Sequence, residues 1–290
     1  MPPIEGGVLS EKDNHHMRNI TGWKTILSLL ISLGYGTQAL AAVVTSQTGP
    51  MASNSINESK EQDWRFAVTP YLWMPSLKGN GMMEGESGRF TLPFHKAMHN
   101  LDFFTLGDVS ASYGPYSMFL DVQYLDVSKH LTFVMPGVSA DASMRTTQVS
   151  LGGSYQAYAQ ALGGETVFGT AQQFAIAPMA GVHWTRLNAR VWGEGHSLGQ
   201  STDWAIPFVG VKVEYDMDPH WTLTAEGDVG AWGRDWGLQG QAYLGYRLGL
   251  WGQESLLRIG YRAIHQDHRT DVLHWNVTQY GPALGVTVWF

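Results

Sequence analysis

Two groups of side chains have residue types that could support acid–base chemistry. His183 stands two residues before Thr185, and His265 is followed by Asp267 and His268. An imidazole beside a hydroxyl or a carboxylate is the combination used in general acid–base and nucleophilic catalysis. Neither group falls in an enzyme motif, and histidine in such positions is more often a hydrogen-bonded structural residue. We therefore predict no catalytic residues, with an enzyme acting on lipid or peptide as the alternative.

Metal and phosphate sites are not indicated either. His95 and His99 have the i, i+4 spacing of a metal-binding pair on a helix, but no third ligand lies near them in the sequence. The glycines of Gly79-Asn-Gly81 and Gly163-Gly164 suit turns rather than phosphate loops, because no helix and lysine follow them. The chain also has no cysteine, which excludes disulfides and thiolate ligands. We expect no metal and no cofactor.

A third set of side chains consists of charged residues placed within runs of alternating polarity. Arg258 and Arg262 are four residues apart, so both leave the same face of a strand. The full set is Arg65, Asp121, Lys212, Glu214, Glu226, Asp228, Arg247, Arg258 and Arg262. Five basic and four acidic groups on one enclosed face are expected to pair, because a buried charge without a partner is destabilising. The sequence therefore predicts a charge network lining a lumen.

The elements that would position this network are β-strands. In residues 238–248 the apolar row includes Leu244, whereas Tyr243 and Gly245 belong to the other row. Such a period of two is typical of strands, and these runs reach about ten residues, twice the usual length in soluble proteins. Aromatic residues are predicted at the ends of the apolar rows, namely Tyr116, Tyr124, Trp184, Trp221, Tyr246, Tyr261 and Tyr280. Because an aromatic girdle marks the two bilayer interfaces, we interpret the apolar face as lipid-facing and the polar face as lumenal.

The pattern predicts an all-β fold, a closed antiparallel up-and-down transmembrane β-barrel of about ten strands, with eight and twelve as alternatives. The predicted strands cover residues 64–73, 108–113, 116–127, 145–155, 174–186, 204–215, 221–231, 238–248, 257–263 and 284–290. The longer connections, 84–105, 128–143, 187–202 and 264–274, are expected to be external loops, with one short helix at 94–104. Residues 157–172 form a further connection, and Pro70 predicts a kink in the first strand. A barrel of this size has an interior filled by side chains.

Composition supports the membrane interpretation. Only 15% of the 290 residues are charged, against about 25% in ordinary soluble domains, so little charge is present to coat a water-facing exterior. The net charge is −7 and no basic run is interleaved with aromatics, which disfavours nucleic acid as a partner. A soluble periplasmic β-sandwich binding protein is the alternative, because its strands alternate in the same way.

The N-terminal region predicts export. Residues 17–41 contain a basic segment with Arg18 and Lys24, an apolar run from Thr25 to Leu33, and small residues ending at Ala41, which together resemble a cleaved signal peptide. Residues 1–16 are interpreted as an upstream extension, with Met17 as the true start. Residues 42–62 have the composition of a flexible leader, and residues 63–290 are assigned to the barrel.

Several segments resemble a largely uncharacterised group of Gram-negative outer-membrane β-barrel proteins of porin-like kind. They are residues 69–79 (TPYLWMPSLKG), 100–104 (NLDFF), 119–126 (FLDVQYLD), 260–262 (GYR) and 281–285 (GPALG). The resemblance spans about residues 64–290 and implies a barrel in the cell outer membrane, without implying a substrate. The terminal aromatic Phe290 also resembles the signal by which the barrel-assembly machinery recognises its clients.

These observations lead to a functional expectation. We expect an outer-membrane barrel with a structural or narrow passive-channel role and a lumen filled by charged side chains. Its expected partners are outer-membrane lipid, the barrel-assembly machinery through the C-terminal strand, and a small solute if the lumen conducts. We do not expect an enzyme; the alternative is an outer-membrane hydrolase or acyltransferase that acts on lipid or peptide at the barrel rim.

Overall fold

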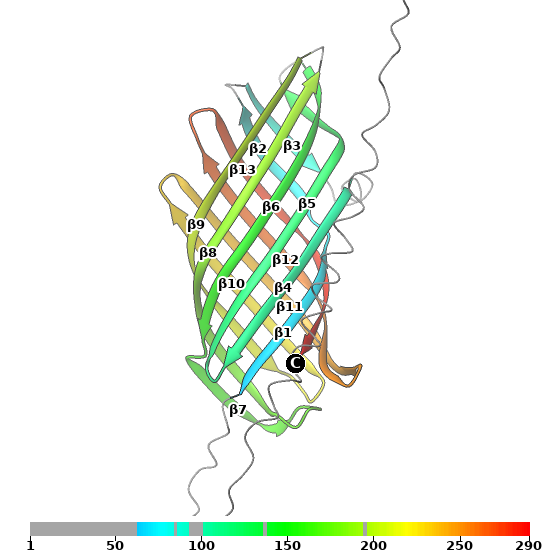
Figure 1. Ribbon diagram of the computed structural model, residues 1–290, viewed down its shortest axis with the longest axis vertical. Helices are drawn as coiled ribbons and strands as arrows, with labels where there is room; N and C mark the ends of the chain where they lie inside the picture. Colours follow the sequence, from blue (N-terminus) through cyan, green and yellow to red (C-terminus); the bar gives the residue numbers. More distant parts are fainter. Residues whose placement is uncertain (1–62, 84–85, 93–100, 136–137, 194–195) are drawn as a thin grey trace, which may run out of the picture. The chain divides into compact units, whose positions relative to one another are not determined.

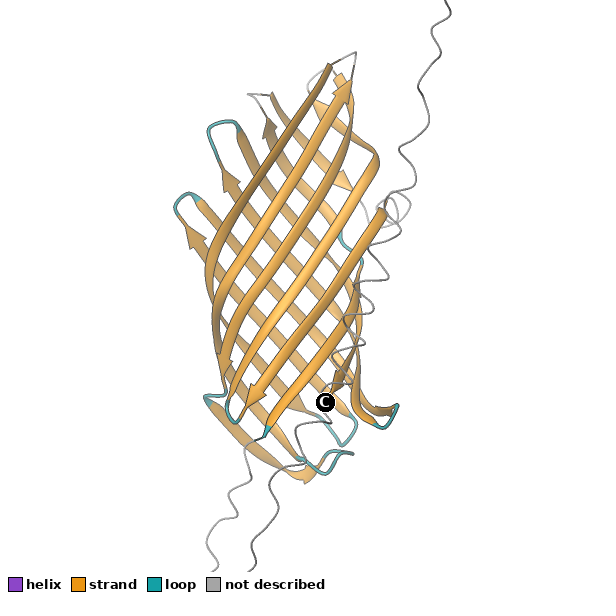
Figure 2. Ribbon diagram, in the orientation of Figure 1, coloured by secondary structure: helices purple, strands orange, loops and turns teal. Residues whose placement is uncertain are grey.

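A computed structural model describes residues 63–83, 86–92, 101–135, 138–193 and 196–290, and all regular elements within these ranges are β-strands (Figure 2). Ten of them form a ring in the order β1 (Trp64–Trp73), β4 (Leu101–Tyr113), β5 (Tyr116–Met135), β6 (Val138–Tyr155), β8 (Ala171–Gly193), β9 (His196–Asp216), β10 (Trp221–Trp232), β11 (Asp235–Leu250), β12 (Gln253–Arg269) and β13 (Leu273–Trp289). Antiparallel pairing of β1 with β13 closes the ring. The predicted closed antiparallel barrel of ten strands is therefore confirmed.

Three further strands extend this ring. β2 (Ser76–Met83) follows β1 and pairs with the first half of β13, β3 (Glu86–Leu92) pairs with β2, and β7 (Tyr158–Glu165) pairs with the beginning of β8. The connection predicted at 157–172 thus contains a strand. The β1–β4 ladder ends at Pro70, which pairs with Gly107, while β1 continues along β13 to Trp73. The break between β1 and β2 comes at Met74 and Pro75, a few residues beyond the kink expected at Pro70.

The predicted helix is wrong where it can be tested. Leu101 to Phe104 belong to β4, while residues 94–100, with His95 and His99, lie outside the described residues. In the part of the chain that the structure describes, no helix has the length and apolar character needed to cross a membrane.

Most of the predicted external loops are strand. Residues 128–143 continue β5 and β6 apart from 136–137, and residues 187–202 continue β8 and β9 apart from 194–195, which lie outside the described ranges. The hairpin of β8 and β9 reaches farthest at the end opposite the C-terminus, which we call the upper end (Figure 1). These segments were predicted as loops because their alternation reverses in polarity there.

The lower part of the barrel has an apolar outer face. On β8 the outward row runs from Phe174 through Val182 to Trp184, and on β9 the outward Val209 is 63% exposed. The ten residue-to-residue steps from Phe174 to Trp184 rise about 33 Å along a strand, or about 25 Å along the axis of a barrel with strands tilted about 40°. That is the height of the apolar band of outer-membrane barrels. Leu244 is likewise exposed while Tyr243 is buried, which confirms the predicted facing of β11.

Above this apolar band the two faces exchange character. On β8 the outward Arg186 and Arg190 are exposed, whereas the inward Leu187 is only 1% exposed. On β9 the outward Ser201 is exposed and the inward Trp204 is buried. An apolar exterior with a polar interior is expected in lipid, and the reverse is expected in water. The level of Trp184 therefore marks the upper boundary of the apolar band.

An aromatic belt surrounds the lower end of the barrel. Its exposed members are Trp64, Phe66, Tyr113, Tyr116, Tyr155, Tyr158, Tyr215, Trp221, Tyr246 and Phe290. Rings from neighbouring strands touch, as in Tyr116 and Tyr155, whose centroids are 5.1 Å apart, and Trp221 and Tyr246, at 4.9 Å. Tyr261 was predicted at the end of an apolar row, but it pairs with Ala242, midway along β11.

Below the belt, the backbone N–H groups of Trp221 and His220 donate to the Asp218 carboxylate and lower its pKa.

The apolar band predicts how an outward charge affects stability. Val209→Arg should lower the free energy of unfolding by about 2 to 4 kcal/mol, because the charge would lie near the middle of the band. Ser201→Arg, on the same strand and face but above the band, should change it by less than about 1 kcal/mol. Urea unfolding in lipid vesicles measures both values. Equal effects of the two substitutions would show that the band does not contact lipid.

Candidate functional site in the barrel lumen

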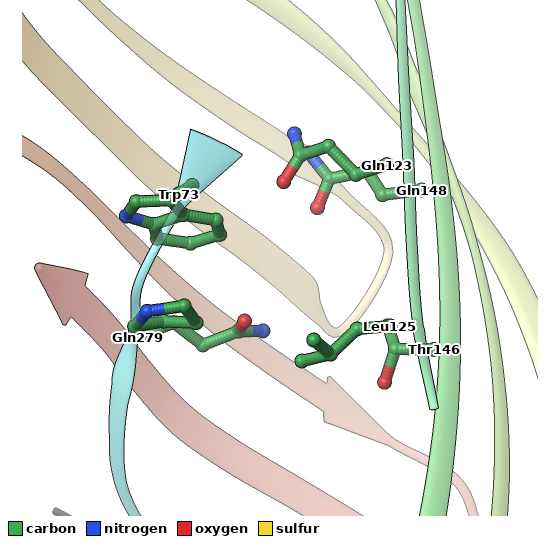
Figure 3. A pocket seen from close by; sticks show the side chains of 7 residues that line it. Trp73, Gln123, Leu125, Thr146, Gln148 and Gln279 are labelled. Atoms are coloured by element: carbon green, nitrogen blue, oxygen red, sulfur yellow. The ribbon is translucent and has the colours of Figure 1, made fainter. Parts of the chain in front are cut away.

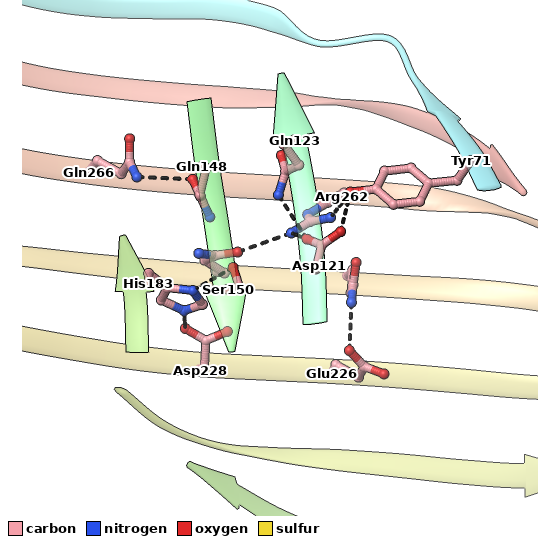
Figure 4. Close-up of polar contacts among 12 residues, drawn as sticks. Tyr71, Asp121, Gln123, Gln148, Ser150, His183, Glu226, Asp228, Arg262 and Gln266 are labelled. Carbon is pink, nitrogen blue, oxygen red and sulfur yellow. Dashed lines mark hydrogen bonds and ion pairs between the residues drawn. The ribbon is translucent and has the colours of Figure 1, made fainter. Parts of the chain in front are cut away.

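The middle of the lumen is organised around the guanidinium of Arg262, which is buried. Its Nη2 donates to Oδ2 of Asp121 at 3.0 Å and to Oε1 of Gln239 at 3.3 Å, and its Nη1 donates to the Tyr71 hydroxyl at 3.0 Å. Tyr71 in turn donates to Oδ1 of Asp121 at 2.6 Å, and Gln123 donates to Oδ2 at 3.0 Å (Figure 4). The Asp121 carboxylate thus accepts bonds from three side chains, as a buried charge requires.

A ladder of charges lies closer to the lower end. Lys212 Nζ is 2.9 Å from Glu214 on its own strand and 3.9 Å from Glu226, its register partner on β10. Gln241 on β11 donates to the other oxygen of Glu226 at 2.5 Å. Because inward residues of adjacent strands stand directly opposite one another, alternation and register together assemble this ladder.

A second chain of polar contacts crosses three strands. His183 Nδ1 lies 2.8 Å from Oγ of Ser150 on β6, and His183 Nε2 lies 3.1 Å from Oδ1 of Asp228 on β10 (Figure 4). An ionised carboxylate only accepts, so Nε2 carries the hydrogen and Nδ1 accepts from the serine hydroxyl when the ring is neutral. The order serine, histidine, aspartate is that of a catalytic triad, but the two ring nitrogens have exchanged partners. Ser150, however, is 2% exposed, so a substrate carbonyl has no access to its Oγ.

Two glycines create the space in which His183 is held. Gly152 and Gly181 are register partners on β6 and β8, and a Cβ on either would lie 2.6 to 2.7 Å from ring atoms of Phe119 or Phe208. The Phe208 ring occupies the space that a Cβ at Gly181 would need, and it stacks on His183 with centroids 4.1 Å apart and planes at 14°. The imidazole is thus fixed by stacking as well as by its two polar contacts.

The upper part of the lumen is filled from wall to wall. Gln266 Nε2 donates to Oε1 of Gln148 and to Oγ1 of Thr185, each at 3.1 Å. Gln266 is on β12 and Gln148 is on β6. These strands are five positions apart in the ring of ten, counted along β12-β13-β1-β4-β5-β6, which is the largest separation that the ring allows. Above them is a buried cluster of Leu77, Met144, Leu187, Trp204, Ile206, Leu273, Trp275 and Val277, which we call the apolar plug. The predicted lumen was polar throughout, and this plug corrects that prediction.

The histidines considered for catalysis near the upper rim have separate partners. His268 stacks on Trp204 and places Nδ1 3.0 Å from Asp235, and His265 contacts Thr278. Asp267 receives bonds from Arg269 and Asn276 and lies 3.1 Å from His274. His265, Asp267 and His268 are therefore not assembled into one site. Thr185, proposed as a partner of His183, instead bonds Gln266.

The structure brings together five members of the predicted charge network. These are Arg262 with Asp121, and Lys212 with Glu214 and Glu226. The other four predicted members have partners that sequence reasoning missed.

Arg65 pairs with Glu254, Arg247 pairs with Asp216, Asp228 contacts His183, and Arg258 lies over the ring of Tyr243 at 5.1 Å. Asp216 and Glu254 were missed because they sit where strands meet turns. Extending the alternating rows would have found them, since Asp216 lies one step beyond Glu214 in the inward row of β9 and Glu254 lies two steps before Arg258 in that of β12.

Phe290 contributes to closure through its backbone. Phe290 and Phe66 exchange two backbone hydrogen bonds, at 2.8 and 3.2 Å, one step beyond the end of β13. The Phe290 side chain is exposed in the aromatic belt. Its predicted role as an assembly signal stays a prediction.

Comparisons with known proteins assign no function to this chain. No model of a protein family matches the sequence, and no curated protein matches it. Similar solved structures include the outer membrane protease OmpT of Escherichia coli, with a TM-score of 0.48, 9% identity and coverage of 79% of this chain and 98% of that chain. Neisserial surface protein A has a TM-score of 0.30, 14% identity and coverage of 77% and 96%. Ail, the attachment invasion locus protein of Yersinia pestis, has a TM-score of 0.33, 9% identity and coverage of 79% and 99%.

At these scores no activity or site residue is transferred from those proteins to this chain. The class of the protein follows from its own architecture. A closed antiparallel barrel with an apolar outer band, a polar lumen and an aromatic belt is a transmembrane β-barrel of the outer-membrane type.

The Arg262 centre predicts a large effect on stability. Arg262→Met should lower the free energy of unfolding by about 3 to 5 kcal/mol, because it leaves the buried Asp121 carboxylate without its cation. Arg65→Met, which breaks the half-exposed pair with Glu254, should lower it by less than about 1 kcal/mol. Urea unfolding in detergent micelles compares the two. A small effect at Arg262 would mean that water screens Asp121.

Proposed function

We propose that this protein resides in the outer membrane as a structural β-barrel whose lumen is closed to solutes. The observation that carries the proposal is the contact of Gln266 with Gln148, which joins strands on opposite sides of the ring. The apolar plug lies directly above this contact and the Arg262 centre lies below it. Three successive levels of packed side chains leave a small barrel without a water-filled path.

The exchange of polarity along the strands supports the location. The apolar band about 25 Å high matches hydrocarbon, and the outward arginines above Trp184 match a polar interface and water. Lipid acyl chains are the partner that this band fits, with residues such as Val209 and Leu244 in contact with them. The upper ends of β8 and β9 then stand in water outside the membrane.

Closure of the lumen predicts the absence of ion conduction. The full-length mature protein, reconstituted in a planar bilayer, should give no discrete conductance steps over a range in which a general porin, used as the positive control, gives clear steps. The reason is that an ion would have to cross the apolar plug without its hydration shell. Reproducible steps from the folded protein would contradict the structural role and support a narrow passive channel.

The C-terminal strand predicts a defect in assembly. Phe290→Asp should reduce the yield of folded barrel in the outer-membrane fraction several-fold, because it removes the terminal aromatic expected to engage the assembly machinery. Phe290→Tyr keeps an aromatic ring in the belt and is the matched control, with a yield close to that of the unaltered chain. Heat-dependent gel mobility of membrane fractions measures the folded yield. An unchanged yield for Phe290→Asp would remove the case for a signal at this residue.

A further inference from the structure

The most exposed large apolar side chain lies outside the lumen, at the lower end of the barrel. Trp251 is 88% exposed, more than any other large hydrophobic residue that the structure describes. Inside the lumen, by contrast, a cavity beside Trp73, Gln123 and Gln148 has a volume of about 20 Å³, enough for one water molecule (Figure 3). A surface for a further partner is therefore better provided by the exterior around Trp251 than by this cavity.

Trp251 occupies a backbone position that its residue type disfavours. It is the first residue of the two-residue turn between β11 and β12, which is flanked by the paired residues Leu250 and Gln253. Its φ is 52°, and that of Gly252 is 78°. Turns with positive φ at both central residues favour asparagine followed by glycine, and a bulky residue in the left-handed region is rare. Trp251 also forms no side-chain hydrogen bond or ring contact with the described residues that would offset this cost.

The hairpin that carries Trp251 bends outward from the barrel wall. Figure 1 shows the β11–β12 turn displaced to the side of the barrel, about level with the C-terminus. The C-terminal residue, Phe290, belongs to the aromatic belt. The outward row of β11 runs from Tyr246, another member of the belt, through Leu248 and Leu250 to the turn. The turn is therefore continuous with the apolar outer surface.

An indole side chain in this position suits the boundary between lipid and water. Its ring is apolar while its N–H donates, and tryptophan is enriched at the headgroup level of membranes for this reason. The half-exposed pair of Arg65 and Glu254 places charged groups in water at the same end of the barrel. We propose that Trp251 binds the headgroup region of the lower leaflet, with its ring beside the lipid and its N–H donating to a phosphate or ester oxygen. This anchor rests on the proposed location of the apolar band in the membrane.

A second copy or another protein could also cover an exposed tryptophan, but the surroundings favour lipid. A specific protein interface involves about 20 to 30 residues on each side, whereas this turn offers two. Its outward neighbours, such as Leu248 and Leu257, lie on the face assigned to acyl chains. A protein partner would have to displace lipid from them.

Single-cysteine labelling locates position 251, because the chain has no cysteine of its own. Trp251→Cys, Val209→Cys and Ser201→Cys would each carry a nitrobenzoxadiazole fluorophore in the full-length mature protein, folded into phosphatidylcholine vesicles. We expect the label at 251 to be quenched mainly by lipids with a nitroxide near the headgroup. The label at 209 should be quenched mainly by a nitroxide at the end of the acyl chain, and the label at 201 by iodide in water.

These labels separate the anchor from the membrane location. Quenching of the label at 251 by iodide, with the label at 209 still quenched from the acyl chains, would overturn the anchor alone. Quenching of the labels at both 251 and 209 by iodide would overturn the membrane location of the band and the anchor with it.

The sign of one substitution tests the anchor independently. Trp251→Asn should raise the unfolding equilibrium constant in phosphatidylcholine vesicles about fivefold to tenfold, because an apolar ring is lost from the lipid interface. Asparagine suits a left-handed turn better than tryptophan does, so a ring that faced water would give a lower constant instead. Trp251→Phe keeps an apolar ring and is the control, with a change of less than about threefold. A constant that is unchanged or lowered by Trp251→Asn would overturn the proposal.

Discussion

Backbone hydrogen bonding in a solvent without water is the constraint on which the rest of this structure depends. In hydrocarbon each N–H and C=O must find a partner within the protein, and a sheet achieves this only when it closes on itself. Here β13 pairs with β1, and the last backbone bonds of the ring are those between Phe290 and Phe66. Closure with ten strands fixes a narrow interior, and the filling of that interior follows from its size.

A narrow interior makes the packing of polar groups demanding. The inward rows bring arginine, aspartate, glutamine and histidine side chains close enough to touch across the ring, and an unpartnered group there has no bulk water to replace its bonds. The structure meets this demand with compact units such as Arg262 with Tyr71 and Asp121, and His183 with Ser150 and Asp228. The second unit has the residue order of a hydrolase triad with the two ring nitrogens exchanged, and its Ser150 is buried.

The same strands serve two environments in succession. Along β8 the outward side chains change from Val182 to Arg186, while the inward ones change from His183 to Leu187. A strand that ended at the membrane surface would need only apolar side chains outward and polar side chains inward. The reversal provides a water-facing wall with its own apolar interior, and that interior forms the plug above the polar lumen. The apolar plug therefore has two roles: it closes the lumen, and it is the core of the part of the barrel that extends beyond the membrane.

The sequence by itself predicted the barrel, a strand number of about ten with eight and twelve as alternatives, the facing of Leu244 and Tyr243, and the aromatic ends of most rows, because a period of two is a local property of the chain. Residues 128–143 and 187–202 were misassigned as loops. In these segments the polar row faces outward and the apolar row inward, so their alternation does not fit a strand whose outer face is assumed to contact lipid. Partners across the lumen depended on tertiary structure alone. Arg262 and Asp121 are 141 residues apart, and Gln266 and Gln148 are 118 apart. Only ring closure and register bring such residues to opposite sides of one narrow space.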